Sequence, residues 1–181
     1  MGHIDIRRAD YGDLPDLVRT LGQEHYFRDR LNSQAIGHGV LLIAWQHGAP
    51  VGDVYLWLAA AEERELRVHL PDVPLITHVE VVEGRRNRRV GTRLIRHAER
   101  FLWEAGRKQV ALGVAMDNDA ARRLYLRLGY TEWPHGPVAT TEVVFLPDGT
   151  RELRPELCAI LTKHLDRGWT DDHTGGPGIS P

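Results

Sequence analysis

The chain has 181 residues and a formal net charge of −2, with 42% hydrophobic and 27% charged residues. A chain of this length can bury a full core as one domain, and the composition is that of a soluble globular protein. No apolar run approaches the roughly 20 residues of a membrane-spanning helix. The small net charge argues against a protein that binds polyanions with its whole surface.

The single cysteine, Cys158, excludes an internal disulfide bond and fits a reducing compartment. The first residues lack the apolar stretch of a secretory signal, so we expect a cytoplasmic protein. Residues 171–181 are rich in Gly, Pro and Asp. This composition predicts one domain over residues 1–167, followed by a disordered tail over 168–181.

Alternating or continuous apolar runs predict the strands. The strands are expected at 4–7, 40–46, 51–59, 75–82, 109–116, 130–133, 140–146, 150–153 and 157–165, with 140–146 and 150–153 forming a hairpin. Periodicity and capping residues predict the helices. The helices are expected from Asp10 or Asp13 to about residue 30, at 33–37, in an exposed insert at 61–70, at 90–105, and from the Asp117-Asn118-Asp119 cap to 128. This order favours an α/β or α+β fold with a mixed sheet.

Residues 86–92 read Arg-Asn-Arg-Arg-Val-Gly-Thr and lie between a predicted strand and a predicted helix. A helix start presents unpaired N–H groups and the positive end of the helix dipole, and arginines add affinity for phosphate. Residues 84–108 carry nine Arg or Lys against two Glu. The turn matches neither a Walker A loop nor a Rossmann fingerprint. We interpret it as a site for a phosphorylated cofactor; a solvated basic helix start and a nucleic-acid patch are the alternatives.

A second segment, 118–130, reads Asn-Asp-Ala-Ala-Arg-Arg-Leu-Tyr-Leu-Arg-Leu-Gly-Tyr. Alone it predicts an ordinary amphipathic helix. Together with the Arg-rich turn, in this order and with a strand between, it resembles the GNAT family of acyl-CoA-dependent N-acyltransferases. Arg86 and Gly91 match the ends of the family's Arg/Gln-x-x-Gly-x-Gly/Ala turn, whereas Arg89 replaces the middle glycine. The later family motif Asn-x-x-Ala-x-x-x-Tyr-x-x-x-Gly-Phe/Tyr is matched at Asn118, Ala121, Tyr125, Gly129 and Tyr130.

The resemblance implies a mixed, mostly antiparallel sheet that splays between its fourth and fifth strands, with helices on both faces. It also implies acetyl-CoA as the cofactor. The pantetheine arm would pair with the fourth strand at Val79, Val81 and Val82, and the pyrophosphate would lie on Arg86, Asn87, Arg88, Arg89, Val90, Gly91 and Thr92. Asn118 would orient the cofactor arm. Tyr125 would protonate the departing thiolate, for which a phenol is a suitable acid.

The general base is less clearly marked. The family often carries an acidic residue four positions before the valine that ends the fourth strand; here that position is Thr77, which cannot act as a base. His78 and Glu80 are the neighbouring candidates, although strand alternation puts them opposite Thr77 unless a bulge intervenes. A core histidine and a structural ion pair explain these two equally well, and water is a further option. Glu24, His25 and Tyr26 are expected on the acceptor side, which makes Glu24 and His25 further candidates.

The implied activity is transfer of an acetyl group from acetyl-CoA to a primary amine of a small molecule, aminoglycosides included, by direct attack in a ternary complex. A peptide or protein N-acetyltransferase and a non-catalytic acyl-CoA-binding regulatory module are the alternatives. We expect no nucleic-acid or membrane partner, and no metal, because the ten histidines lack ligand spacing. The acidic remainder of the chain favours a cationic acceptor. The oligomeric state stays open, with a homodimer as one option.

Overall fold

The computed structural model describes residues 3–86 and 89–166, so the predicted tail at 168–181 lies outside the described residues. The strands are β1 (Asp5–Arg8), β2 (Gly39–Gln46), β3 (Ala49–Trp57), β4 (Leu75–Val81), β5 (Gln109–Ala115), β6 (Thr131–Glu132), β7 (Val138–Phe145) and β8 (Arg151–His164). The helices are α1 (Leu14–Leu21), α2 (Glu24–Ala35), α3 (Arg64–His69), α4 (Val90–Glu104) and α5 (Asp119–Arg127), with short 3-10 turns η1 (Tyr11–Asp13) and η2 (Glu83–Arg85).

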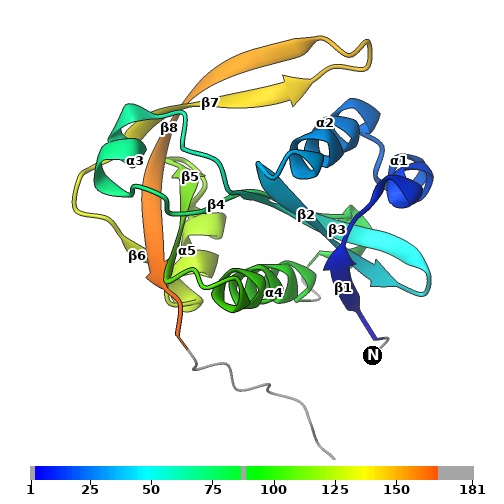
Figure 1. Cartoon of the computed structure of the whole chain (residues 1–181), viewed down its shortest axis with the longest axis horizontal. Helices are drawn as coiled ribbons and strands as arrows, with labels where there is room; N and C mark the ends of the chain where they lie inside the picture. The colour runs from blue at the N-terminus through cyan, green and yellow to red at the C-terminus, as the bar shows by residue number, and fades with distance from the viewer. Residues whose placement is uncertain (1–2, 87–88, 167–181) are drawn as a thin grey trace, which may run out of the picture.

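The strands form one sheet in the order β1-β2-β3-β4-β5-β8-β6, and β7 pairs with β8. Only β4 and β5 run parallel, and their pairing is limited to Leu75 with Ala111 and Ile76 with Leu112. Beyond these two pairs the strands separate (Figure 1). The predicted splay between the fourth and fifth strands is therefore confirmed, as is the mostly antiparallel mixed sheet.

Helices cover both faces of the sheet, as predicted (Figure 1). On one face, Leu94, Ile95 and Leu102 of α4 share a buried cluster with α5 and the strands beneath. On the other face, Leu17 of α1 and Phe27 of α2 pack in a second cluster with residues of β2 and β3. Among the helices of the described ranges, none combines the length and apolar character that a membrane crossing requires.

The prediction of one helix from Asp10 or Asp13 to about residue 30, with a separate helix at 33–37, is wrong. Gly22 and Gln23 both have positive φ, 70° and 55°, and this left-handed backbone ends α1. A new helix, α2, then begins at Glu24 and continues to Ala35. The break turns the chain so that the Gln23 side chain reaches Glu80 on β4, with Nε2 to Oε2 at 2.8 Å.

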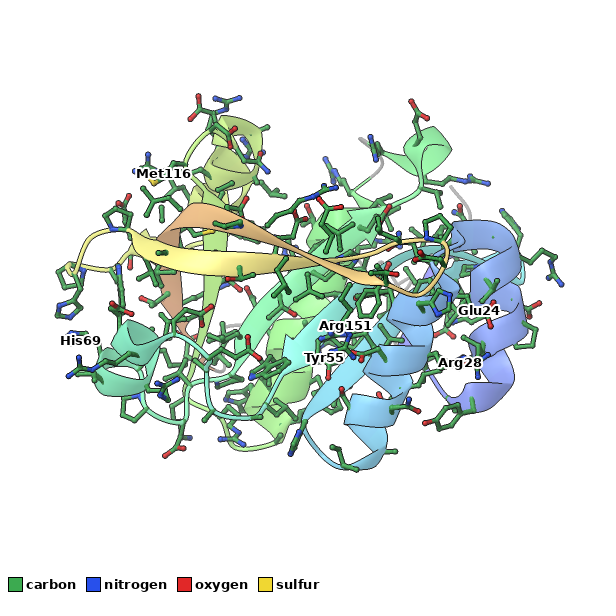
Figure 2. The ribbon with its side chains drawn as sticks, turned by 90° about the horizontal axis from the view of Figure 1, so that it is seen from above. Glu24, Arg28, Tyr55, His69, Met116 and Arg151 are labelled. Atoms are coloured by element: carbon green, nitrogen blue, oxygen red, sulfur yellow. The ribbon has the colours of Figure 1, made fainter. Side chains whose placement is uncertain are left out.

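The predicted strands at 150–153 and 157–165 are in fact one strand, β8. Pro155 lies within it, opposite Thr141 of β7. A proline is tolerated there because β5 pairs only with Cys158 to His164, so the outer half of β8 has β7 as its neighbour and needs no second ladder. The hairpin of β7 and β8 consequently projects past β5 and crosses over the molecule toward α2 (Figure 2).

The insert predicted at 61–70 is helical over α3, but it is not wholly exposed. Leu66 is buried in a small cluster with Trp133, Val138, Cys158 and Ile160. The side of α3 that carries Leu66 thus anchors the segment 58–74 beside the base of the β7–β8 hairpin.

Candidate active site

The open edge of β4 lies beside the segment predicted to bind the cofactor arm. Because β5 pairs with β4 only at Leu75 and Ile76, the edge of β4 that faces β5 is unpaired from Thr77 onward. The side chains of Val79, Val81 and Val82 are partly buried against the cluster beneath α4. Backbone groups of this edge are therefore available to an extended ligand, as the pairing of a pantetheine arm requires.

The N-terminus of α4 follows this edge and is an open anion site. Neither a side-chain cap nor an acidic residue in the first turn satisfies its N–H groups, which include those of Val90, Gly91 and Thr92. The Arg86 side chain folds back, and its Nε donates to the carbonyl oxygen of Val81 at 3.2 Å. Asn87 and Arg88, also predicted here, lie outside the described residues. The arrangement fits a pyrophosphate at the end of the β4 edge.

Arg89 shows why this chain can depart from the family's glycine. Its φ of 62° and ψ of 12° lie in the left-handed region, which glycine adopts at the lowest cost. Its side chain is exposed, so the arginine keeps the backbone conformation and directs its bulk outward. At Gly91, an added Cβ would meet nothing closer than Val81 Cγ2 at 3.7 Å, so packing within the chain does not demand a glycine there.

The second motif forms α5. Asn118 caps this helix, with its Oδ1 accepting from the Ala121 N–H at 3.1 Å. Tyr125 is 9% exposed, and its ring packs edge-on against Tyr130 with centroids 5.5 Å apart. Its hydroxyl makes no hydrogen bond within the described part of the chain. Burial raises the pKa of Tyr125 to about 12, so the phenol is neutral at physiological pH and retains a proton to donate.

A bulge in β4 determines where the candidate bases point. Tyr55 of β3 lies opposite His78, and the next residue, Leu56, lies opposite Ile76, so Thr77 is an extra residue. Asp53 lies opposite Glu80 in the same register. Asp53 and Tyr55 share one face of β3, so the bulge leaves His78 and Glu80 on that face together, the one that α2 covers.

His78 lies between two carboxylates. Its Nε2 is 3.5 Å from Asp53 Oδ2 and 3.3 Å from Glu80 Oε2. Asp53 is buried at 1% exposure, and the Tyr26 hydroxyl donates to its Oδ2 at 3.3 Å. The Tyr26 ring also covers the imidazole, with centroids 4.5 Å apart. Tyr26, one of the three residues predicted for the acceptor side, thus belongs to this cluster.

The three ionisable groups of the cluster have displaced pKa values. Burial raises the pKa of Asp53 to about 6. The His78 imidazole 3.3 Å away, together with the hydrogen bond from Gln23, lowers the pKa of Glu80 to about 2. Burial lowers the pKa of His78, but the carboxylates of Glu80 and Asp53 outweigh burial and raise that pKa above its ordinary value of 6.5. Of the two candidate bases, Glu80 has a lowered pKa and His78 a raised one, so His78 is the stronger base.

A cavity of about 710 Å³ adjoins this cluster, within the range of small-molecule sites. Leu75, Thr77, His78 and Glu80 of β4 line it from below, together with Trp57 of β3. Its walls come from α2 and from the segment before α3. The β7–β8 hairpin covers it and is fastened to α2, because Arg151 forms an ion pair with Asp29 at 2.7 Å and Phe145 packs edge-on against Tyr26. Figure 2 shows the hairpin, which carries Arg151, crossing above Tyr55 toward α2.

Comparison with known proteins identifies the family. The profile of the acetyltransferase (GNAT) family matches residues 5–130. The chain belongs to this family. GNAT membership implies acetyl transfer that depends on an acyl-CoA. A separate search of curated protein sequences found no match.

Solved structures of GNAT enzymes share the fold. The ribosomal-protein-S18-alanine N-acetyltransferase from Escherichia coli superposes with a TM-score of 0.63 at 17% identity, covering 94% of this chain and 99% of the other. The PaiA N-acetyltransferase from Thermoplasma acidophilum, solved with coenzyme A, gives 0.59 at 14% identity, covering 90% and 99%. AAC(6')-Iy, bound to the bisubstrate analogue CoA-S-monomethyl-acetylneamine, gives 0.60 at 18% identity, covering 72% and 92%.

Two of the residues predicted for the acceptor side of this GNAT protein do not line the cavity. Glu24 forms an ion pair with Arg28 at 2.7 Å, and Figure 2 shows both on the side of α2 away from the hairpin's crossing. The His25 ring instead packs against the hairpin turn, where a Cβ at Gly149 would lie 3.0 Å from His25 Cε1. The helix break explains the difference, because it sets the rotation of α2 independently of α1.

Asp53 is the residue that the sequence reasoning missed. The available signal was a lone carboxylate in an otherwise apolar strand, Val51 to Trp57. Asp53, His78 and Glu80 also bring one ligand atom each within 4.8 Å of one another, a donor set that divalent cations accept. Histidine spacing alone, from which no metal was predicted, could not detect a group assembled from two strands.

Proposed function

We propose that this GNAT protein transfers the acetyl group of acetyl-CoA to a primary amine of a small molecule, by direct attack in a ternary complex. One observation carries the proposal: the strand with the free edge, β4, also contributes His78 and Glu80 to a covered cavity. A thioester held along that edge and an amine held in the cavity would meet at the same strand. Holding the two reactants together supplies much of the acceleration of such a reaction.

On the donor side, the chain offers groups for each part of the cofactor. The edge at Val79 to Val82 would pair with the pantetheine arm, and the start of α4, with Arg86, Arg89 and the amides of Val90, Gly91 and Thr92, would hold the pyrophosphate. Asn118 has its amide nitrogen left to orient the arm, since its Oδ1 caps α5. When bound, acetyl-CoA supplies the activated acetyl group. Backbone N–H groups of β4 would stabilise the oxyanion that develops at its carbonyl.

Tyr125 is the proposed acid. Its hydroxyl is protonated because burial raises the pKa to about 12, and it has no partner in the described protein to compete for the proton. Donation of that proton to the departing thiolate prevents the reverse attack. The family motif and the buried surroundings of the hydroxyl together support Tyr125 as the acid better than the motif alone.

The His78–Glu80 pair is the proposed base. Glu80, with its side chain 42% exposed, is the member that an incoming ammonium group can meet. A proton received at the Glu80 carboxylate can be held on His78 Nε2, 3.3 Å away, where Asp53 stabilises the imidazolium. Because the three groups are coupled, they titrate as a unit, and the pair rather than either residue is the base.

The covered cavity favours a small acceptor over a protein chain. The similar structures include one named for a ribosomal-protein alanine and one bound to an acetylneamine analogue, so the fold does not select the acceptor. A polypeptide would need an open groove for the residues that follow its N-terminus. Here the hairpin lies across the cavity and is fastened to α2 by its contacts with Asp29 and Tyr26, which leaves less room for a polypeptide.

A combined thermal-shift and turnover screen tests the proposal. Acetyl-CoA should raise the melting temperature because it binds only the folded chain, and a panel of primary amines should release thiol from acetyl-CoA. The matched control is each amine as its tertiary N,N-dimethyl analogue, which keeps the charge and cannot form an amide. Thermal protection by CoA without amine-dependent thiol release would identify a regulatory module instead.

A further inference from the structure

We propose that Asp53, His78 and Glu80 form a binding site for one divalent transition-metal ion, and that Zn²⁺ is the ion that their chemistry and spacing suit best. The three residues come from the neighbouring strands β3 and β4. A bound ion would occupy the proposed base and so inhibit acetyl transfer. The inhibition rests on the proposed function, whereas the binding site does not.

The donor atoms have the spacing of a tetrahedral metal site. Zinc binds histidine nitrogen at about 2.0–2.1 Å and carboxylate oxygen at about 2.0–2.2 Å, which puts neighbouring donors of a tetrahedron roughly 3.3–3.5 Å apart. His78 Nε2 lies 3.5 Å from Asp53 Oδ2 and 3.3 Å from Glu80 Oε2. The ligand atoms of all three residues lie within 4.8 Å of one another. A rotation of the Glu80 side chain, which is 42% exposed, would bring the two carboxylates onto one ion.

The nitrogen between the two carboxylates lacks a hydrogen bond. His78 Nε2 is enclosed by protein, yet within the described ranges it has no partner of acceptable hydrogen-bond geometry. The oxygens of Asp53 and Glu80 are close to this nitrogen, so they must lie off the direction of its N–H. Such an arrangement suits a metal ion, because the donors of a metal site point at the ion and not at one another.

The buried carboxylate is only partly satisfied. Asp53 is 1% exposed, and among the described residues its carboxylate accepts one hydrogen bond, from the Tyr26 hydroxyl at 3.3 Å. An ionised carboxylate has about four acceptor positions, and leaving them unused in a buried site is costly. Arg30, a cation in the cavity lining, is bound to Asp29 at 2.9 Å instead. A divalent cation bound beside a neutral His78 would balance both carboxylates.

Both carboxylates also have the outer hydrogen bonds that orient metal ligands. Gln23 Nε2 donates to Glu80 Oε2 at 2.8 Å, and the Tyr26 hydroxyl donates to Asp53 Oδ2. Each of these oxygens keeps a further lone pair for an ion. His78 and Glu80 line the cavity, which gives an ion a path of entry and leaves room for water as the fourth ligand.

The binding site is tested with Co²⁺, which can take the place of Zn²⁺ and absorbs visible light strongly when it is four-coordinate and weakly when it is six-coordinate. Protein dialysed against EDTA is titrated with Co²⁺ and then with Zn²⁺. We expect strong visible bands that saturate at one Co²⁺ per chain and disappear when Zn²⁺ displaces the cobalt. Weak bands of six-coordinate Co²⁺, or no saturation, would mean an adventitious ion only and would overturn the inference.

Variants locate the ligands. Asp53→Asn and Glu80→Gln should each weaken Zn²⁺ binding about tenfold or more, measured by competition with a coloured chelator. Glu80 is partly exposed, so its variant remains informative if the buried Asp53→Asn protein fails to fold. The matched control is His69→Gln, because His69 stacks on His135, with ring centroids 3.7 Å apart, outside the proposed ligand set. Equal zinc affinity in Glu80→Gln and the wild type, or a loss in His69→Gln, would overturn the assignment.

Inhibition is measured on the wild-type protein by the yield of N-acetylated amine, since the thiol released from acetyl-CoA would itself bind zinc. We expect one equivalent of Zn²⁺ to reduce the rate about tenfold or more, and excess EDTA to restore it. An unchanged rate with zinc bound would overturn the inhibitory role. If the metal-free protein shows the cobalt bands but acetylates no amine, the proposed function fails and the metal site stands.

Discussion

Replacing Asp53 with Asn should move the acid limb of the pH–rate profile to lower pH. Asp53 Oδ2 lies 3.5 Å from His78 Nε2. At an effective dielectric constant of about 20, two opposite unit charges at this distance attract by roughly 4–5 kcal/mol. This energy is an upper bound, because burial raises the pKa of Asp53 to about 6 and the carboxyl group is therefore partly neutral. Removing a carboxylate beside an imidazole typically lowers the imidazole pKa by about 1–3 units. Because the Glu80 carboxylate remains beside His78, we expect the pKa of His78 to fall by about 1 unit.

The sign follows from the role of the base. His78 must be unprotonated to accept a proton, so activity is lost as the pH falls through its pKa. Asp53→Asn lowers that pKa, and kcat/KM for an amine should persist to a pH lower by the same amount. The plateau at high pH should fall severalfold, because a weaker base remains. Asparagine keeps the shape and can still accept the hydrogen bond from Tyr26.

The assay is thiol release from acetyl-CoA as a function of pH for the wild type, Asp53→Asn and Tyr26→Phe. The last variant removes the hydroxyl bound to Asp53 but keeps the carboxylate next to His78, so its acid limb should move far less. The amine's own ionisation contributes equally to all three profiles. An acid limb that stays in place in a folded Asp53→Asn protein would refute the assignment of His78 as the titrating group.

Three further substitutions test other parts of the site and of its support. Tyr125→Phe should lower kcat about 100-fold with little change in CoA affinity, because the hydroxyl makes no bond within the described protein; unchanged single-turnover rates would remove the acid role. Arg89→Gly should raise the free energy of unfolding by roughly 0.5–1 kcal/mol, since relief of the left-handed strain exceeds glycine's added entropy in the unfolded chain. A midpoint of urea denaturation below that of the wild type would contradict the strain. Gly52→Ala should cost about 1–3 kcal/mol, because its Cβ would lie 2.6 Å from the Glu80 carbonyl oxygen; a melting curve equal to that of the wild type would disprove the clash.

The helices and strands that carry the proposed cofactor site could be predicted from the sequence, because they depend on local signals. The Arg-rich turn needs only a strand before it and a helix after it, and both are visible in the apolar pattern. The cap at Asn118 and the stop at Gly129 likewise depend on residues close in the chain. Strand order and the splay come from the family resemblance rather than from the pattern, because short strands of equal periodicity can pair in several ways.

The acceptor side depends on a β-bulge, a helix break and strand pairing, none of which can be predicted from the periodicity of apolar residues. One extra residue at Thr77 decides which face His78 and Glu80 occupy, and a bulge leaves the apolar pattern almost unchanged. The break at Gly22 separates Tyr26 from the helix in which we placed it. Asp53 acquires its role only because β3 pairs with β4 at that register. The hairpin that lies across the cavity depends on β8 continuing through Pro155, a residue that normally argues against a strand interior.

The most direct test is the stoichiometry of transfer. Purified protein is mixed with acetyl-CoA and a primary amine that the turnover screen identifies, and the released thiol and the N-acetylated amine are quantified in the same sample by mass spectrometry. We expect one acetamide for each thiol, with both products absent when the amine is omitted. Thiol released without acetylated amine, or an acetyl group recovered on the protein itself, would contradict direct transfer to an amine in a ternary complex.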